Sequence, residues 1–258
     1  MATTHHSTAI LHPGAEIGDG CEIGPYCIVG AHVRLGPDCR LHAHVVIDGH
    51  TVLGARNEVY PFACLGARSQ DLKWRGGLTR VEIGDDNTFR EYVTVHAATA
   101  DGGVTTLGSH NHLLAYTHVA HDCRLGNHIV MSNLAQMAGH VTVEDHAILA
   151  GMSAIHQFCR IGRLAMVAAC TPVRQDVVPF MLVSGDPAVT VKANTVGLER
   201  AGVPPEVIRT LGQAHRIVFR DGLALPNALT RLESELPDSP ELRHLIRFLR
   251  SSERGITR

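Results

Sequence analysis

The chain has 258 residues, of which 45% are hydrophobic and only 4% aromatic, which is enough for a sizeable core of small aliphatic side chains. Its formal net charge is −2, with acidic and basic residues interspersed, so the sequence gives no overall electrostatic case for binding nucleic acid. Residues 1–13 (MATTHHSTAILHP) lack the basic and apolar regions of a secretory signal, and no apolar run is long enough to span a bilayer. We therefore expect a cytoplasmic protein.

Aliphatic residues recur every six positions over the first two thirds of the chain. The first ten are Leu11, Ile17, Ile23, Val29, Leu35, Leu41, Ile47, Leu53, Val59 and Leu65. After an interruption, the same spacing runs without a break from Leu107 to Val173. A helix has a period of 3.6 and an ordinary strand alternates, so this spacing predicts a β-solenoid of short strands and tight turns.

The repeat, [LIV]-G-x-x-x-x, resembles that of the hexapeptide-repeat proteins. This resemblance implies a left-handed parallel β-helix with three flat sides and three hexads to a coil. Residues 18 apart would then stack on successive coils, about 4.8 Å apart as neighbouring strands are. Five of the seven cysteines share the slot four residues after the aliphatic position, where we expect buried free thiols: Cys21, Cys27, Cys39, Cys123 and Cys159.

Two segments break the frame and are expected to loop out, residues 67–79 (ARSQDLKWRGGLT) and 97–106 (AATADGGVTT). Insertions from a solenoid commonly build its functional face. Beyond Val173 the period ends, and residues 175–192 are interpreted as a crossing segment. Helices are expected over residues 195–201, 205–220, 226–236 and 240–252. We therefore divide the chain into a β-helix (1–192) and a C-terminal helical domain (193–258).

The segment from Leu114 to His140 carries the cluster His118-x-x-His121-Asp122. The 18-residue spacing places Asp122 directly below His140, and His121 below Gly139 and then Gln157. A carboxylate holds a neighbouring imidazole in one tautomer and stabilises its protonated form, as a general base requires. A histidine that only hydrogen-bonds a turn is the simpler alternative, but it does not explain this column of stacked polar groups.

The other histidines are interpreted as structural. His110, His128 and His146 are 18 residues apart and should form a ladder on the surface. A zinc site of the kind found in β-helical carbonic anhydrases would need two histidines five residues apart, and no two histidines in this chain have that separation. We therefore expect no metal and no cofactor.

Several motifs resemble, in order along the chain, the UDP-N-acetylglucosamine O-acyltransferases that begin lipid A synthesis. They are SQDLKW (69–74), TRVEIGDDNTFREYVTVH (79–96), THVAHDC (117–123), AGHV (138–141), GMSAIHQFCRIG (151–162) and NTVGLERAG (194–202). The resemblance covers nearly the whole chain. It implies transfer of a 3-hydroxyacyl group from acyl carrier protein to the 3-position of the UDP-sugar, by a homotrimer with sites between its subunits.

The resemblance also implies roles for individual residues. His121 would be the general base, Asp122 would orient it, and the Gly139 N–H would stabilise the thioester oxyanion. Asp71, Lys73, His118 and His140 would contact the sugar nucleotide. His156 and Gln157 would line the acyl-carrier side, and Asn194 and Arg200 would meet uridine and diphosphate. Gly151 and Ala169 would line the slot for the acyl chain.

Three positions depart from the family pattern: Val196 replaces a common glutamate, Pro187 a histidine, and Ala169 a glycine of the acyl slot. Ala169 lies about 2.7 coils beyond His121, roughly 13 Å at the spacing of strands. At about 1.2 Å per bond, this predicts an acyl chain of about ten to twelve carbons.

Five alternatives stand beside this interpretation. The acceptor could be a 3-amino UDP-sugar, giving an amide, because no residue decides between oxygen and nitrogen. A coenzyme A-dependent transferase would lack the helical tail, and the enzyme that N-acylates the next intermediate would carry a uridine-binding domain for which a repeat starting at Leu11 leaves no room. A non-catalytic solenoid scaffold would not need His121 and Asp122 beneath a Gly-His pair, and an ice-binding solenoid would show threonine ladders.

Overall fold

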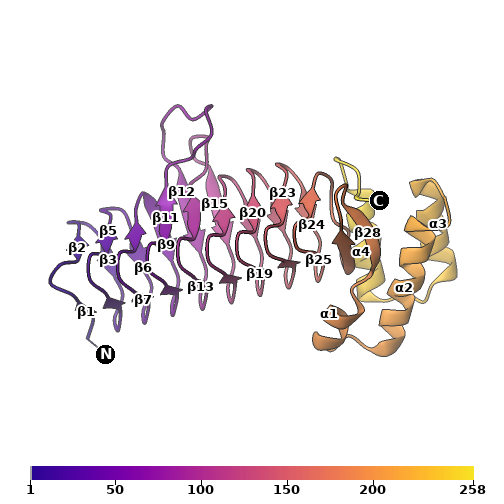
Figure 1. Cartoon of the computed structure of the whole chain (residues 1–258), viewed down its shortest axis with the longest axis horizontal. Helices are drawn as coiled ribbons and strands as arrows, with labels where there is room; N and C mark the ends of the chain where they lie inside the picture. The colour runs from indigo at the N-terminus through magenta and orange to yellow at the C-terminus, as the bar shows by residue number, and fades with distance from the viewer. Residues whose placement is uncertain (1) are drawn as a thin grey trace.

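The computed structural model describes residues 2–258. The chain forms a long three-sided parallel β-helix, with four helices packed at its C-terminal end (Figure 1). The six-residue spacing predicted the solenoid, and the resemblance to hexapeptide-repeat proteins implied this left-handed parallel β-helix.

Each side of the prism is one sheet, and most of its strands are only two residues long. The first sheet contains β1 (Thr4–His5), β4 (Glu22–Ile23), β7 (Arg40–Leu41), β10 (Glu58–Val59), β13 (Thr88–Phe89), β16 (His112–Leu113), β19 (Val130–Met131), β22 (Ile148–Leu149), β25 (Met166–Val167), β27 (Met181–Ser184) and β28 (Val189–Ala193). The second contains β2 (Ile10–Leu11), β5 (Ile28–Val29), β8 (Val46–Ile47), β11 (Cys64–Ala67), β14 (Thr94–His96), β17 (His118–Val119), β20 (Gln136–Met137), β23 (Ala154–Ile155) and β26 (Pro172–Val173). The third contains β3 (Glu16–Ile17), β6 (Arg34–Leu35), β9 (His50–Leu53), β12 (Arg80–Ile83), β15 (Val104–Leu107), β18 (Arg124–Leu125), β21 (Thr142–Val143) and β24 (Arg160–Ile161).

The strand register confirms the 18-residue coil. Val119 pairs in parallel with Met137, and Met137 pairs with Ile155. In most strands the second residue points inward, so the aliphatic side chains of successive coils fill one continuous core, and the five repeat-slot cysteines are buried beside them. Each buried aliphatic side chain contributes about 1.5–3 kcal/mol. The strict period of six is therefore set by the core.

The two insertions project from the same region of the prism and pack on each other (Figure 1). The Ala97 N–H donates to the Ala67 carbonyl at 2.8 Å, and the hydroxyls of Ser69 and Thr99 are 2.7 Å apart. The expected second loop, 97–106, was too long, because β15 begins at Val104 and pairs with β12. We refer to residues 68–79 and 97–103 as the insertion lobe.

The expectation of a crossing segment over residues 175–192 was wrong. β27 continues the first sheet by pairing in parallel with β25, and β28 then returns antiparallel to β27. The two strands form an antiparallel hairpin, in which β27 alternates between buried and less buried side chains and β28 does not keep the six-residue spacing. The sequence pattern for the coil therefore disappears although the sheet continues.

Four helices follow, with bounds within two residues of those expected: α1 (Thr195–Arg200), α2 (Pro205–Phe219), α3 (Leu225–Glu235) and α4 (Pro240–Arg250). The Ser239 hydroxyl caps α4 by accepting from the Leu242 N–H. Leu211, Leu232 and Leu245 pack with Phe180 in a second apolar cluster over the end of the solenoid. The division of the chain into a β-helix (1–192) and a helical domain (193–258) remains a proposal. Residue 1 lies outside the part of the chain that the structure describes.

No helix within residues 2–258 combines the length and the apolar character that crossing a membrane requires.

Candidate active site

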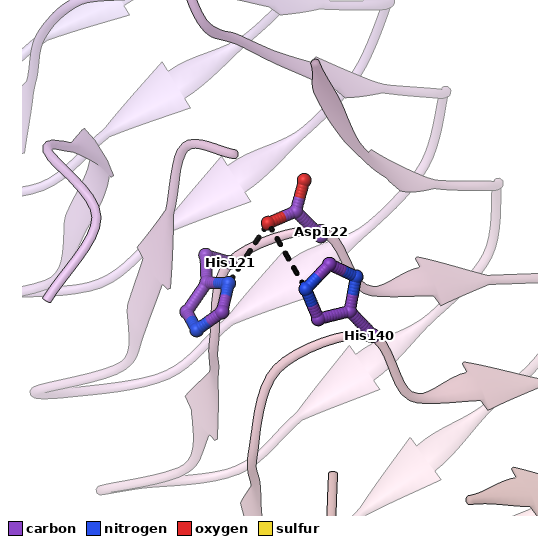
Figure 2. Close-up of side chains that lie close together, drawn as sticks. All are labelled: His121, Asp122 and His140. Carbon is purple, nitrogen blue, oxygen red and sulfur yellow. Dashed lines mark hydrogen bonds and ion pairs between the residues drawn. The ribbon is translucent and has the colours of Figure 1, made fainter. Parts of the chain in front are cut away.

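His121 and Asp122 occupy a corner of the prism just after β17. Asp122 has a left-handed backbone (φ 61°), and the His121 Nδ1 lies 2.8 Å from the Asp122 Oδ2. On the next coil His140 stacks above Asp122, with its Nε2 3.7 Å from the same oxygen (Figure 2). The two imidazole rings are nearly perpendicular, at 88°, with centroids 5.3 Å apart. The structure thus brings together the three residues that the 18-residue spacing placed in one column.

The Asp122 carboxylate is held by the insertion lobe. Its Oδ2 accepts from the Thr99 N–H at 3.1 Å, while the Asp122 N–H donates to the Thr105 hydroxyl at 2.8 Å. A carboxylate only accepts, so the His121 Nδ1 carries the proton and its Nε2 keeps a lone pair. The side chains of His121 and Asp122 are only 15% and 14% exposed, which limits competition from water for their hydrogen bond.

Gly139 lies directly above the His121 ring. A Cβ at this position would be 2.3 Å from the His121 Cε1 and 2.5 Å from its Nε2, closer than non-bonded carbon atoms approach. The residue is buried, and its N–H donates no hydrogen bond within residues 2–258. Only glycine leaves room for the His121 ring here, and its amide is free to bind another acceptor.

His118 lies on β17, beside His121. Its Nδ1 lies 2.7 Å from the Thr94 hydroxyl, and its ring meets His96 edge to face at 5.0 Å. Burial lowers the pKa of His118 to about 4, helped by the neighbouring His96 and His121. Burial also lowers the pKa of His96. His118 is therefore neutral at physiological pH and serves as a hydrogen-bonding group.

The insertion lobe brings Asp71 over the other nitrogen of the His121 ring. The Asp71 Oδ2 is 3.8 Å from the His121 Nε2, and its Oδ1 accepts from the Lys73 N–H at 2.9 Å. That hydrogen bond lowers the pKa of Asp71, and the nearby charges of His121, Lys73 and His140 act in the same direction. The Lys73 side chain is exposed on the lobe.

His156 and Gln157 lie one coil further on and are exposed. Phe158 beside them stacks on the His140 ring, with centroids 4.7 Å apart, and the Arg254 Nη2 lies 3.3 Å from the His156 Nδ1. Sequence reasoning missed Thr94, His96, Phe158 and Arg254. The 18-residue spacing from His140 could have revealed Phe158, whereas no local pattern links Arg254, 98 residues away, to His156.

Asn194 and Arg200 lie away from this cluster in the single chain. They line a separate cavity of about 410 Å³ with His128, His146 and Val196, to which neither His121 nor His140 contributes among the described residues. Asn194 is buried and caps α1: its amide donates to the Leu164 carbonyl and its oxygen accepts from the Gly197 N–H. Arg200 is exposed.

Gly151 and Ala169 stack in one column, as the spacing predicts, because the Cys170 N–H donates to the Gly151 carbonyl at 3.0 Å. This column, however, lies at the edge before the second sheet, whereas His121 lies at the edge after it. The proposed acyl slot, about 2.7 coils above His121 along the axis, therefore lies in one chain at the opposite end of the short second-sheet strands.

The expected surface ladder of His110, His128 and His146 is confirmed. Successive rings stack with centroids 4.8 and 4.6 Å apart, at interplanar angles of 7° and 2°.

The fold and this site define a hexapeptide-repeat β-helix protein that carries a buried histidine–carboxylate pair at one corner. A model of the bacterial transferase hexapeptide matches residues 2–37, and one described as UDP N-acetylglucosamine O-acyltransferase, domain 2, matches residues 176–257.

Whole-chain relatives agree. The acyl-[acyl-carrier-protein]–UDP-N-acetylglucosamine O-acyltransferase of Alkalilimnicola ehrlichii is 50% identical over 198 residues, covering 76% of this chain and 77% of the relative. That of an Anaeromyxobacter species is 49% identical over 98% of this chain and 99% of its own length. The solved structure of LpxA from Acinetobacter baumannii superposes with a TM-score of 0.95 at 42% identity, covering 98% and 99% of the two chains. The chain therefore belongs to the acyl-[acyl-carrier-protein]–UDP-N-acetylglucosamine O-acyltransferase family, and it is an acyltransferase.

Proposed function

We propose that this enzyme transfers a 3-hydroxyacyl chain from acyl carrier protein to the 3-hydroxyl of UDP-N-acetylglucosamine, the first step of lipid A biosynthesis, in the cytoplasm. The relatives carry both substrates in their name. The observation that carries the proposal in this chain is the His121–Asp122 pair beneath Gly139, whose N–H donates no hydrogen bond within residues 2–258.

In the proposed reaction the His121 Nε2 removes the proton of the acceptor hydroxyl as its oxygen attacks the thioester carbonyl. The oxyanion of the tetrahedral intermediate accepts from the N–H of Gly139, the residue on the coil above His121. Collapse of the intermediate forms the ester, breaks the carbon–sulfur bond and returns the proton from His121 to the departing thiolate. Asp122 stabilises the imidazolium in between. A thioester is already activated, so this chemistry requires no metal or cofactor.

The remaining residues are proposed to hold the substrates. Asp71, Lys73, His118 and His140 surround the base from the lobe and the adjacent coil and would bind the sugar. His156 and Gln157 would face the carrier protein, where Arg254 adds a positive charge suited to an acidic partner.

A homotrimer explains why Asn194, Arg200, Gly151 and Ala169 lie away from His121 in one chain. A second copy can place its own edge beside the His121 corner, so that uridine, diphosphate and acyl chain bind between subunits. The guanidinium of Arg200 suits a diphosphate. Asn194 would reach uridine only with the groups that its capping role leaves free.

The acyl chain is proposed to have about ten to twelve carbons. The distance along the prism axis between His121 and Ala169 stays the same when Ala169 comes from a neighbouring subunit that lies parallel to the first. The methyl group of Ala169 would end the slot in place of the hydrogen of a glycine.

Product analysis by mass spectrometry tests the proposal. Purified protein is supplied with a series of 3-hydroxyacyl carrier proteins and either UDP-N-acetylglucosamine or its 3-amino analogue. We expect an ester on the 3-hydroxyl, lost about 10²–10⁴-fold in His121→Ala and retained in the control His112→Ala, whose side chain is exposed on β16. Acylation of only the amino analogue would overturn the assigned acceptor, and acylation from coenzyme A thioesters alone would overturn the assigned donor.

A further inference from the structure

The corner that carries the base also groups three metal-binding side chains. His121, Asp122 and His140 each offer one ligand atom, and these atoms lie within 4.8 Å of one another. Figure 2 shows both imidazoles directed at one carboxylate oxygen, from 2.8 Å for the His121 Nδ1 and 3.7 Å for the His140 Nε2. Ligands about 2.1 Å from a tetrahedral zinc ion are about 3.4 Å from each other. The two nitrogens lie 2.8 and 3.7 Å from the Asp122 oxygen and within 4.8 Å of each other, so side-chain shifts of about 1 Å would place all three groups around an ion.

We propose that His121, Asp122 and His140 bind a divalent transition-metal ion, with Zn²⁺ as the best fit, and that the bound ion inhibits the enzyme. Two imidazoles and a carboxylate suit zinc, whereas magnesium and calcium prefer oxygen ligands alone. The five-residue histidine spacing of the β-helical carbonic anhydrases does not apply to these three residues, because they come from two neighbouring coils.

The surroundings of His121 independently fit a metal ligand. A histidine that binds a metal through one nitrogen usually donates its other N–H to a carboxylate, which fixes the tautomer. Asp71 provides that group, 3.8 Å from the His121 Nε2. The Thr99 N–H holds the Asp122 carboxylate in place, so both an outer carboxylate and an orienting backbone donor are present.

The mode of inhibition follows from the tautomer. In the metal-free enzyme the proton is on Nδ1 and the lone pair of Nε2 acts as the base. A metal ion takes the lone pair of Nδ1, so the neutral ring must carry its proton on Nε2, directed at Asp71, and can no longer accept one from a substrate. This part of the inference rests on the proposed role of His121, whereas metal binding itself does not.

The other histidine cluster serves as an internal control. The rings of His110, His128 and His146 stack almost parallel, at 7° and 2°, so their nitrogens do not converge on one point. Histidine content alone therefore does not explain a site at the His121 corner, and His128→Ala is a matched exposed-histidine control.

Calorimetric titration of the intact protein with ZnCl₂, and visible absorption after adding CoCl₂, test binding without any substrate. We expect one ion per chain and a tetrahedral Co²⁺ spectrum. Asp122→Asn and His140→Ala should each weaken binding at least tenfold, Asp71→Asn should weaken it about tenfold, and His128→Ala should leave it unchanged. Absence of stoichiometric binding, or equal loss in His128→Ala, would overturn the site.

A second arm tests inhibition. Acylation by the wild type should fall as the site fills with Zn²⁺ and recover fully when a chelator is added. The zinc affinity should also weaken as the pH falls, because protons compete for the ligands. Binding without inhibition would refute the inhibitory role while leaving the site standing, and an enzyme that acylates neither acceptor would count against the proposed function alone.

Discussion

Gly139→Ala is the substitution that most directly tests the packing of the base. A Cβ at residue 139 would lie 2.3 Å from the His121 Cε1 and 2.9 Å from its Nδ1. Carbon atoms in contact are about 3.5 Å apart, so the ring must retreat by about 1 Å. That displacement breaks the alignment of Nδ1 with Asp122 and moves Nε2 away from the acceptor.

The expected loss of kcat/KM is about 10²-fold, the usual effect of a misplacement of about 1 Å in a catalytic group. Overpacking of the buried corner should also lower the free energy of unfolding by about 1–3 kcal/mol. Single-turnover acyl transfer and denaturant unfolding measure the two effects separately.

Gly212→Ala is the matched control, because a Cβ there meets nothing within 4 Å and a helix favours alanine over glycine. It should keep full activity and gain up to about 1 kcal/mol of stability. A Gly139→Ala enzyme with activity within about threefold of wild type would refute the reasoning that the ring cannot move without loss of catalysis.

Three further results are expected. The pKa of His118 is about 4 in the folded protein and about 6.5 in the unfolded chain, so the unfolded chain binds the additional proton between these pH values. The free energy of unfolding should therefore decrease by on the order of 2–3 kcal/mol as the pH is lowered from about 6.5 to about 4. The pH dependence of urea unfolding should be shallower in His118→Asn, and an unchanged slope would contradict this. Asn87→Ala should lower the free energy of unfolding by about 2–4 kcal/mol, because buried Asn87 accepts from the Asn111 N–H and that donor would lose its partner; chemical denaturation with Thr88→Ala as control measures it, and a loss below about 1 kcal/mol would contradict the importance of this hydrogen bond. Ala169→Gly should shift the preferred acyl chain to a greater length by removing one methyl group from the slot, as product mass spectrometry would reveal, and an unchanged length profile would exclude Ala169 from the slot.

The sequence predicted the β-helix, its coil length and the four helices because these depend on repeating local rules. An inward-facing aliphatic residue is needed in every hexad, and proline and serine mark helix starts such as Pro205 and Ser239. The hairpin of β27 and β28 escaped prediction because it packs on the helices, so its pattern depends on a partner distant in the chain.

The candidate site divides in the same way. The 18-residue coil that the hexapeptide-repeat resemblance implied placed His121 below Gly139 and Asp122 below His140, because stacking of coils converts that separation into contact. It could not reveal that the insertion lobe would bring Asp71 to the other side of the ring, since an irregular loop carries no register.

The sequence by itself determined the arrangement along the solenoid: which residues point inward, which residues stack, and on which coil each polar group lies. The tertiary structure decided what surrounds that axis, including the lobe over His121, the contact of Arg254 with His156, and the separation of the Ala169 column from the base. The physical reason is that hydrogen bonds between successive coils have a fixed period, whereas loops and helices are positioned by apolar packing, which has no period along the chain.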